Sequence, residues 1–338
     1  MAIDRPDPLY DEAAADRRIA ADRGDILATL AKADNRMLVR DYRAASAFYG
    51  AVGRLAGGGT PIERSELLRA RDAALWLDQR FGEILQEGLS AAGLCPAQRH
   101  PRFQKSLEIM MGQRPRDAVF TKFPQMPQSY FYPDLPQVDF ADRAAGPWRS
   151  EVELQTATIL TEAQVLLADP ASFLPYVQQT TERPQGDVHG LLDNAEWSTC
   201  YLTDRGQPIP ERVALAPVTF ETLDQHAPLC RIAPRAPSIM FSLLRAHSRI
   251  PAHTGMINTR LVCHLPLIVP EDCGFRVGET KRQWQVGELM VFDDSVEHEA
   301  WNDSDEDRLV LIFDIWRPEL SADERAQVTA LFAVVDAY

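Results

Sequence analysis

The sequence predicts an α+β protein in which an N-terminal α-helical domain precedes a C-terminal double-stranded β-helix, or jelly roll. Three observations support this prediction: helical apolar spacing over the first ~115 residues, a proline-rich stretch, and short alternating β-type runs after about residue 193. Several short strands at such spacing indicate a sandwich or barrel, and a jelly roll fits. The predicted domains are a helical region at 1–113, a connecting strap at 114–148 and the jelly roll at 149–338.

The helical region contains four segments with an apolar face. Residues 10–22 are rich in alanine, Asp25 opens a second segment, and the glycines at 57–59 end a third that begins near Tyr42. Pro61 precedes the fourth and longest segment. Two antiparallel helix pairs of this size resemble tetratricopeptide units, although they lack a clean repeat of about 34 residues. The region is therefore a helical scaffold or a platform that docks a peptide or protein.

The second half of the chain is built from shorter elements. The strap carries aromatic residues between its prolines (SYFYPDLP), so we expect it to pack across the next domain. An amphipathic helix is predicted over 149–168. The β-type runs that follow are residues 197–202, 239–244, 259–268, 287–293 and 307–316.

Composition excludes several classes of protein. The chain has 35 basic and 49 acidic residues, a net charge of −14, so nucleic acid and anionic membranes are not expected partners. No apolar run approaches the ~20 residues of a membrane span, and the N-terminus does not resemble a signal peptide, which favours a cytoplasmic protein. The five cysteines are never spaced as CxxC, so free thiols are expected rather than disulfides or a structural zinc site.

Alternation along two of the β-type runs predicts which side chains face inward. It places Arg260 and His264 on one face of the run 259–268, and Arg308 on one face of the run 307–316. Because the opposite faces are also apolar, we expect His264 and Arg308 to point into the barrel. A cation there is costly unless an anion meets it, so the pattern indicates a pocket for a small carboxylate.

Two further histidines, His253 and His298, lie in unusual local sequence in the same region. Inward histidines, an inward arginine and no nucleophile favour a non-haem iron oxygenase that uses 2-oxoglutarate. The usual facial triad adds a carboxylate two residues after the first histidine, but that position is Gly255, which cannot bind a metal. Four acidic residues near His298 are better explained by turn formation or by loop hydrogen bonds: Asp293, Asp294, Glu297 and Glu299.

Three segments resemble the aspartyl/asparaginyl β-hydroxylase family: HTGMINTRLVCHLPLIVPEDC, VGELMVFDDSVEHEAWND and RLVLIFDIWRPEL. The resemblance covers roughly 190–320, and more weakly the strap and the helix at 149–168. Its specific signal is the FDDSxEHE stretch with a His-Thr-Gly 45 residues upstream. Members of the family are similar in carrying glycine where Gly255 stands, so the missing carboxylate supports the resemblance.

The resemblance implies that His253 and His298 bind Fe(II), and that the reaction uses 2-oxoglutarate and O2 as co-substrates. It implies further that Arg308 holds the distal carboxylate of 2-oxoglutarate and that His264 contacts its other end. The remaining implied positions are a hydroxyl on the co-substrate and an aromatic lining, at Ser242 and Trp197.

One position departs from the family pattern. Some members carry an arginine two residues before the equivalent of His264, where this chain has Val262; Arg260, on the same face, is the candidate replacement. The implied activity is hydroxylation at Cβ of an Asp- or Asn-type residue in a peptide or peptide natural product, with release of succinate and CO2. The alternatives are a cupin-like binding module without oxygenase activity, a hydroxylase of free amino acids or lipid acyl chains, and a helical-repeat adaptor. The expected partner is a peptide or small-molecule substrate, which the helical domain would dock.

Overall fold

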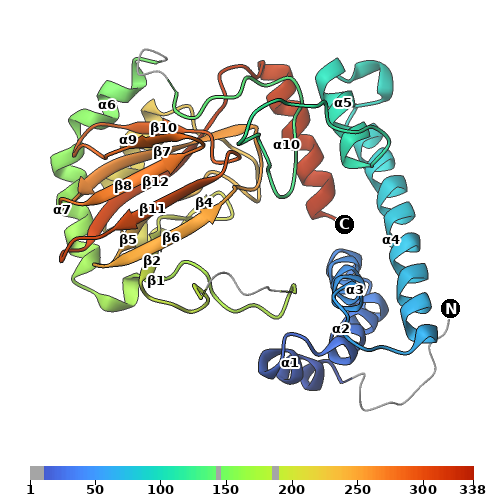
Figure 1. The fold of residues 1–338 in the computed structure, drawn as a ribbon. Helices are drawn as coiled ribbons and strands as arrows, with labels where there is room; N and C mark the ends of the chain where they lie inside the picture. Colours follow the sequence, from blue (N-terminus) through green and yellow to red (C-terminus); the bar gives the residue numbers. More distant parts are fainter. Residues whose placement is uncertain (1–10, 142–145, 185–189) are drawn as a thin grey trace. The chain divides into compact units, whose positions relative to one another are not determined.

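The computed structural model describes residues 11–141, 146–184 and 190–338 (Figure 1). Its contacts divide the chain into two compact units. The first comprises the N-terminal residues up to Ala92, a segment that begins at Gln178, and Val334–Tyr338; the second comprises most of the remainder, from Gly93 to Ala333.

Four helices form the first unit, as the apolar spacing predicts: α1 (Glu12–Ala21), α2 (Ile26–Leu38), α3 (Tyr42–Gly57) and α4 (Arg64–Ala91). Aspartates begin the first three helices, and the carboxylates of Asp11, Asp25 and Asp41 each accept a hydrogen bond from a backbone N–H in the first turn. Helices α2, α3 and α4 share one apolar core. The similarity to tetratricopeptide units stays a prediction.

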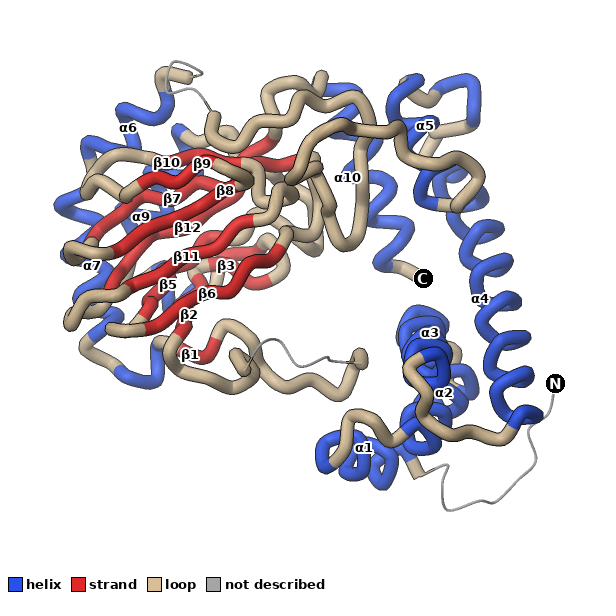
Figure 2. The backbone as a smooth tube through the Cα atoms, viewed as in Figure 1, coloured by secondary structure: helices blue, strands red, loops and turns tan. Residues whose placement is uncertain are grey.

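Two antiparallel sheets form the centre of the second unit (Figure 2). The first has the order β1-β2-β5-β12-β7-β10 and the second β6-β11-β8-β9. A separate hairpin pairs β3 (Thr203–Asp204) with β4 (Gln207–Pro208). The strands of the six-stranded sheet are β1 (Leu174–Pro175), β2 (Trp197–Tyr201), β5 (Ile239–Leu244), β7 (Arg260–Ile268), β10 (Met290–Phe292) and β12 (Arg308–Trp316). Those of the four-stranded sheet are β6 (Ser248–His253), β8 (Cys273–Val277), β9 (Thr280–Arg282) and β11 (His298–Asn302). This arrangement is the expected jelly roll.

Helices cover the outer face of the six-stranded sheet (Figure 1). They are α6 (Trp148–Leu154), α7 (Thr156–Leu167) and α9 (Pro217–His226), with the short α8 (Pro210–Val213) beside α9 in the sequence. A large apolar cluster between helices and sheet contains Leu261, Cys263 and Leu265 from β7. A second cluster lies between the sheets, so the alternate residues of β7 face inward. The alternation read from the sequence therefore assigns the faces of β7 correctly.

The second unit differs from the prediction in its smaller elements. Gln155 interrupts the helix predicted over 149–168 and divides it into α6 and α7. None of the strands of the four-stranded sheet was predicted. They are three to six residues long, and β8 is an alternating strand, with Cys273, Phe275 and Val277 on its buried face, that is too short to stand out in the sequence. Four helices of the described residues were also missed: α5 (Pro101–Met110), α8, α9 and α10 (Ala322–Asp336).

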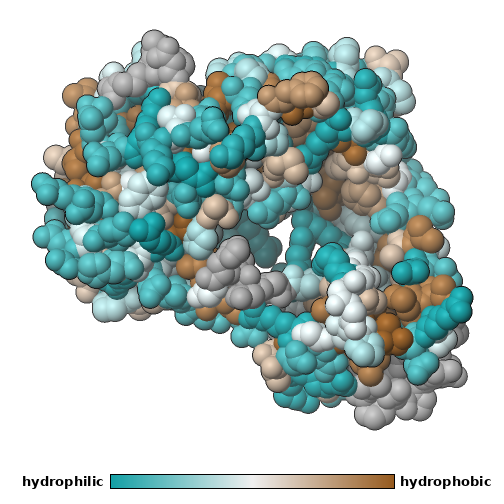
Figure 3. All heavy atoms as spheres, viewed as in Figure 1, coloured by the Kyte–Doolittle hydropathy of each residue, from teal (hydrophilic) through white to brown (hydrophobic). Residues whose placement is uncertain are grey.

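The strap contacts the jelly roll through its backbone. Met126 N–H donates to the carbonyl of Ser295 (2.7 Å), and Ala141 N–H donates to that of Val291 (2.8 Å). The face of the second unit that Figure 3 presents is largely hydrophilic. None of the helices in the described ranges combines the length and apolar composition that a membrane span needs. All five cysteines are free thiols, as expected.

Candidate active site

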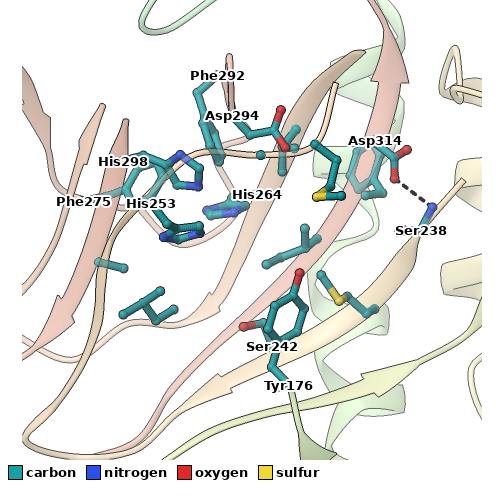
Figure 4. Close-up of a pocket in the computed structure, with 18 of the residues that line it drawn as sticks. Tyr176, Ser238, Ser242, His253, His264, Phe275, Phe292, Asp294, His298 and Asp314 are labelled. Carbon is teal, nitrogen blue, oxygen red and sulfur yellow. Dashed lines mark hydrogen bonds between the residues drawn. The ribbon is translucent and has the colours of Figure 1, made fainter. Parts of the chain in front are cut away.

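His253 and His298 face one another across two neighbouring strands. The antiparallel register of β6 and β11 pairs their Cα atoms, and their ring centroids are 4.2 Å apart (Figure 4). The Nδ1–H of His253 donates to the carbonyl of Pro251 (2.7 Å) and that of His298 to the carbonyl of Val296 (3.0 Å). These bonds fix Nε2 as the basic nitrogen of each ring, the form in which imidazole binds a metal. Burial, together with His253, lowers the pKa of His298 to about 3, so this ring is neutral at pH 7.

Arg308 is a buried cation without a counter-ion. Its side chain is 1% exposed, and no carboxylate within the described ranges forms an ion pair with it. Its Nη2 donates to the hydroxyl of Ser242 (3.3 Å), which also accepts from Trp197 Nε1 (3.2 Å), and Nε has no acceptor. The guanidinium lies 4.9 Å from the ring centre of Trp284. Burial lowers the pKa of Arg308 to about 10, so the group remains charged at pH 7 and an anion in the pocket would stabilise it.

His264 is a third histidine in the lining of this cavity. Its Nδ1 accepts a hydrogen bond from Trp284 Nε1 (3.3 Å). Burial, then the charge of Arg308, lowers the pKa of His264 well below its usual value, so the ring is neutral. A neutral imidazole that accepts at Nδ1 carries its proton on Nε2, which makes His264 a hydrogen-bond donor for a bound carboxylate.

The opposite end of the cavity holds one cation between two carboxylates. Arg260 Nη1 contacts Asp314 and Nη2 contacts Asp294, each at 3.2 Å. Asp314 also accepts from the backbone N–H of Ser238 (2.7 Å; Figure 4). Asp294 is 5% exposed, and its Oδ1 is buried without a hydrogen-bond partner. Burial raises the pKa of Asp294 to about 6, against the opposing effect of Arg260.

The four acidic residues near His298 do not share one role. Asp293 accepts hydrogen bonds from Ser295 within the loop, as predicted, and also pairs with Arg317 (2.7 Å). Glu297 and Glu299 pair with Arg276 of β8, and Glu299 does so from strand β11 rather than from a loop. The same explanation was wrong for Asp294, which lines the cavity.

Packing explains why the third metal ligand is missing. A Cβ atom on Gly255 would overlap the carboxylate of Asp294, so no side chain fits at this position. Gly255 N–H also donates to the backbone carbonyl of Asp294 (2.6 Å). No group of three or more His, Cys, Asp or Glu side chains suited to a metal occurs in the described part of the chain. The donor set is therefore two imidazoles, which suits Fe(II) with several positions left for exogenous oxygen ligands.

Comparison with known proteins agrees with this geometry. A model of the family described as aspartyl/asparaginyl beta-hydroxylase matches residues 153–318, the segment that contains both histidines and Arg308. Residues 153–318 are thus similar to an aspartyl/asparaginyl β-hydroxylase domain. The resemblance read from the sequence is thereby confirmed, and the family supports a hydroxylase.

The relatives of this segment include proteins whose names state different substrates. The chain is 33% identical over 142 residues to the aspartyl/asparaginyl beta-hydroxylase of Mus musculus, with 42% of this chain and 19% of the mouse protein covered. It is 32% identical over 180 residues to the ornithine lipid ester-linked acyl 2-hydroxylase of Rhizobium tropici, with 52% and 60% covered. The chain thus spans about a fifth of one relative and three fifths of the other. Among solved structures, a predicted oxalate decarboxylase from Thermotoga maritima matches 36% of this chain and 81% of its own, with 12% identity and a TM-score of 0.24.

The structure gathers every predicted site residue around one cavity of about 300 Å³. Those residues are Trp197, Ser242, His253, Arg260, His264, His298 and Arg308. Val262 lines the same cavity, next to Arg260 on the inner face of β7. Sequence reasoning missed Asp314, although the alternation that assigns Arg308 to the inner face of β12 extends to it. It also missed Tyr176, whose ring stacks on that of Trp197 with centroids 3.9 Å apart. No local sequence pattern indicates that Tyr176 lines the cavity.

Proposed function

We propose that the protein is an Fe(II)- and 2-oxoglutarate-dependent dioxygenase that hydroxylates Cβ of an Asp- or Asn-type residue in a peptide. The observation that carries the proposal is Arg308, a buried guanidinium without a counter-ion in the cavity that contains the two facing histidines. A dicarboxylic acid would satisfy this cation at one end and reach a metal at the other.

His253 and His298 would hold Fe(II) through their Nε2 atoms, and Gly255 has no side chain that could supply a carboxylate as third ligand. When bound, Fe(II) supplies the activation of O2. In the overall reaction one oxygen atom enters the C–H bond and the other enters succinate, while C1 of 2-oxoglutarate leaves as CO2. The electrons come from the oxidative decarboxylation, so no further reductant is needed.

The protein's own side chains bind and orient the co-substrate. Arg308 can hold the distal carboxylate in bidentate geometry, and Ser242 adds a hydroxyl at the same place. The Nε2–H of His264 can donate to a carboxylate oxygen. Aromatic rings line this part of the cavity and exclude water, with Phe292 4.8 Å and Phe275 5.2 Å from the His264 ring.

Oxygen-dependent formation of succinate tests the proposal. His253→Ala and His298→Ala should abolish 2-oxoglutarate turnover, since each removes half of the protein's metal ligands. His247→Ala is a matched control, because this ring is exposed and pairs only with the exposed Asp305 among the contacts of the described residues. His226 is a second control, and His189 lies outside the described residues. Turnover at the normal rate in the double variant would contradict the proposal, and binding of 2-oxoglutarate without turnover would favour a cupin-like binding module.

A second candidate is hydroxylation of a lipid acyl chain. It is favoured by the similarity to the Rhizobium tropici protein, of which this chain covers 60%. Mass spectrometry separates the candidates: peptides and ester-linked acyl lipids are incubated in parallel with enzyme, Fe(II) and 2-oxoglutarate. The class that gains one oxygen atom identifies the substrate.

A further inference from the structure

The charges around the cavity are distributed unevenly between its two ends. Of the described residues that line it, the arginines are Arg260 and Arg308 and the carboxylates are Asp294 and Asp314. Arg308 has no carboxylate partner, which suits the anionic co-substrate of the proposed function. Arg260 is held by both carboxylates at 3.2 Å. The charge of Arg260, at the end of the cavity away from Arg308, is therefore already balanced by two carboxylates.

This end, which we call the substrate end, has one arginine against two carboxylates among its described lining residues, a surplus of negative charge. It also holds one buried acceptor and one buried donor without a partner, Oδ1 of Asp294 and Nε of Arg260. Asp314 has a second donor in the N–H of Ser238, so Asp294 is the less satisfied of the two. Figure 4 shows Asp294 and Asp314 on the same side of the pocket, above Tyr176. A buried acceptor without a donor is costly, so a ligand that brings an N–H group to this place is favoured.

We propose that the substrate end of the cavity binds a neutral group with N–H donors and rejects a carboxylate, so that the preferred peptide side chain is Asn rather than Asp. The inference rests on the proposed function, which assigns Arg308 to the co-substrate. A carboxamide and a carboxylate have nearly the same shape, so the choice between them depends on charge and on hydrogen-bond direction. The carboxamide can donate to Asp294 through its N–H and accept from Nε of Arg260 through its oxygen, whereas a carboxylate would add a negative charge beside two acids that share one arginine.

Val262 offers a way to reverse the preference. It lines the cavity, and the register of β7 and β12 places it directly opposite Asp314. Val262→Arg would add a cation at the substrate end and equalise the numbers of arginines and carboxylates there. Val262→Met adds comparable bulk without charge and is the matched control.

The test uses the full chain and two peptides that differ only in one Asn or Asp. Binding is measured by calorimetry with Mn(II) and 2-oxoglutarate present, and hydroxylation is measured by mass spectrometry with Fe(II). We expect the Asn peptide to be preferred by about a hundredfold or more in kcat/KM, because a site built around buried acceptors discriminates strongly against a group that cannot donate. Val262→Arg should reduce this ratio at least tenfold, and Val262→Met should leave it within about threefold.

Equal use of the two peptides, preference for Asp, or binding of neither peptide would overturn the inference. So would an equal change of the ratio in the arginine and methionine variants, because bulk rather than charge would then be responsible. The two proposals fail separately. If the Asn peptide binds preferentially but no succinate forms, the oxygenase reaction is wrong and the charge argument stands.

Discussion

Replacement of Arg308 should change stability and co-substrate affinity in opposite directions. Burial depresses the pKa of this side chain to about 10, which corresponds to about 3 kcal/mol of destabilisation of its charged form. Arg308→Met would remove that cost and keep most of the volume. It would also lose the hydrogen bond to Ser242 and the contact with Trp284, worth about 1 kcal/mol each. The net expectation is a gain of about 1 kcal/mol in the free energy of unfolding without 2-oxoglutarate.

The same substitution should weaken 2-oxoglutarate binding severely. An unpaired carboxylate at this buried place costs about 3–5 kcal/mol, which is a hundredfold or more in apparent affinity. Arg308→Lys should restore only part of the affinity, because an ammonium cannot bind a carboxylate in bidentate fashion. The assay is thermal unfolding with and without 2-oxoglutarate, together with the KM for 2-oxoglutarate in succinate release. Added 2-oxoglutarate should stabilise the native protein but not Arg308→Met.

Two results would refute this reasoning. An unchanged KM in Arg308→Met or Arg308→Ala would show that another cation holds the co-substrate. A loss of several kcal/mol in the stability of Arg308→Met without 2-oxoglutarate would show that the guanidinium already has a favourable partner in the native protein.

Three further predictions concern other parts of the chain. Gly255→Ala should displace the Asp294 carboxylate and lower the free energy of unfolding by about 1–3 kcal/mol, as measured by urea unfolding; an unchanged midpoint would show that the loop adjusts freely. Burial opposes ionisation of Glu324, but hydrogen bonds from Arg102, Ser321 and Tyr132 lower its pKa to about 2, so its stabilisation is complete above about pH 4.5 and is lost as the pH falls to about 2. Glu324→Gln should therefore cost about 3 kcal/mol at pH 7 and flatten the curve of stability against pH between pH 4.5 and 2. A curve parallel to that of the native protein would contradict the assignment. Deletion of residues 1–92 should preserve slow succinate release and remove peptide hydroxylation, once circular dichroism shows that the remainder folds; undiminished hydroxylation would exclude a docking role for the helices.

The sequence by itself determined the fold class and the inward faces of β7 and β12. A period of two is a local property, so Arg260 and His264 on β7 and Arg308 on β12 could be assigned to one face without any knowledge of the fold. The motifs around His253 and His298 indicated the site through resemblance. The helices of the first unit followed from apolar spacing and from stop signals such as the glycines at 57–59.

Only the tertiary structure decided how the charged groups of the site are paired. Arg260 was the candidate replacement for the arginine that is absent at Val262, but its partners Asp294 and Asp314 are 34 and 54 residues away in the sequence. Likewise, the space that Gly255 leaves is filled by Asp294 from a separate loop. Strand register and side-chain packing bring such groups together, and neither leaves a local periodic signal. The charge that a pocket presents to its ligand is therefore a property of the assembled sheets, even where each residue that lines it can be named from the sequence.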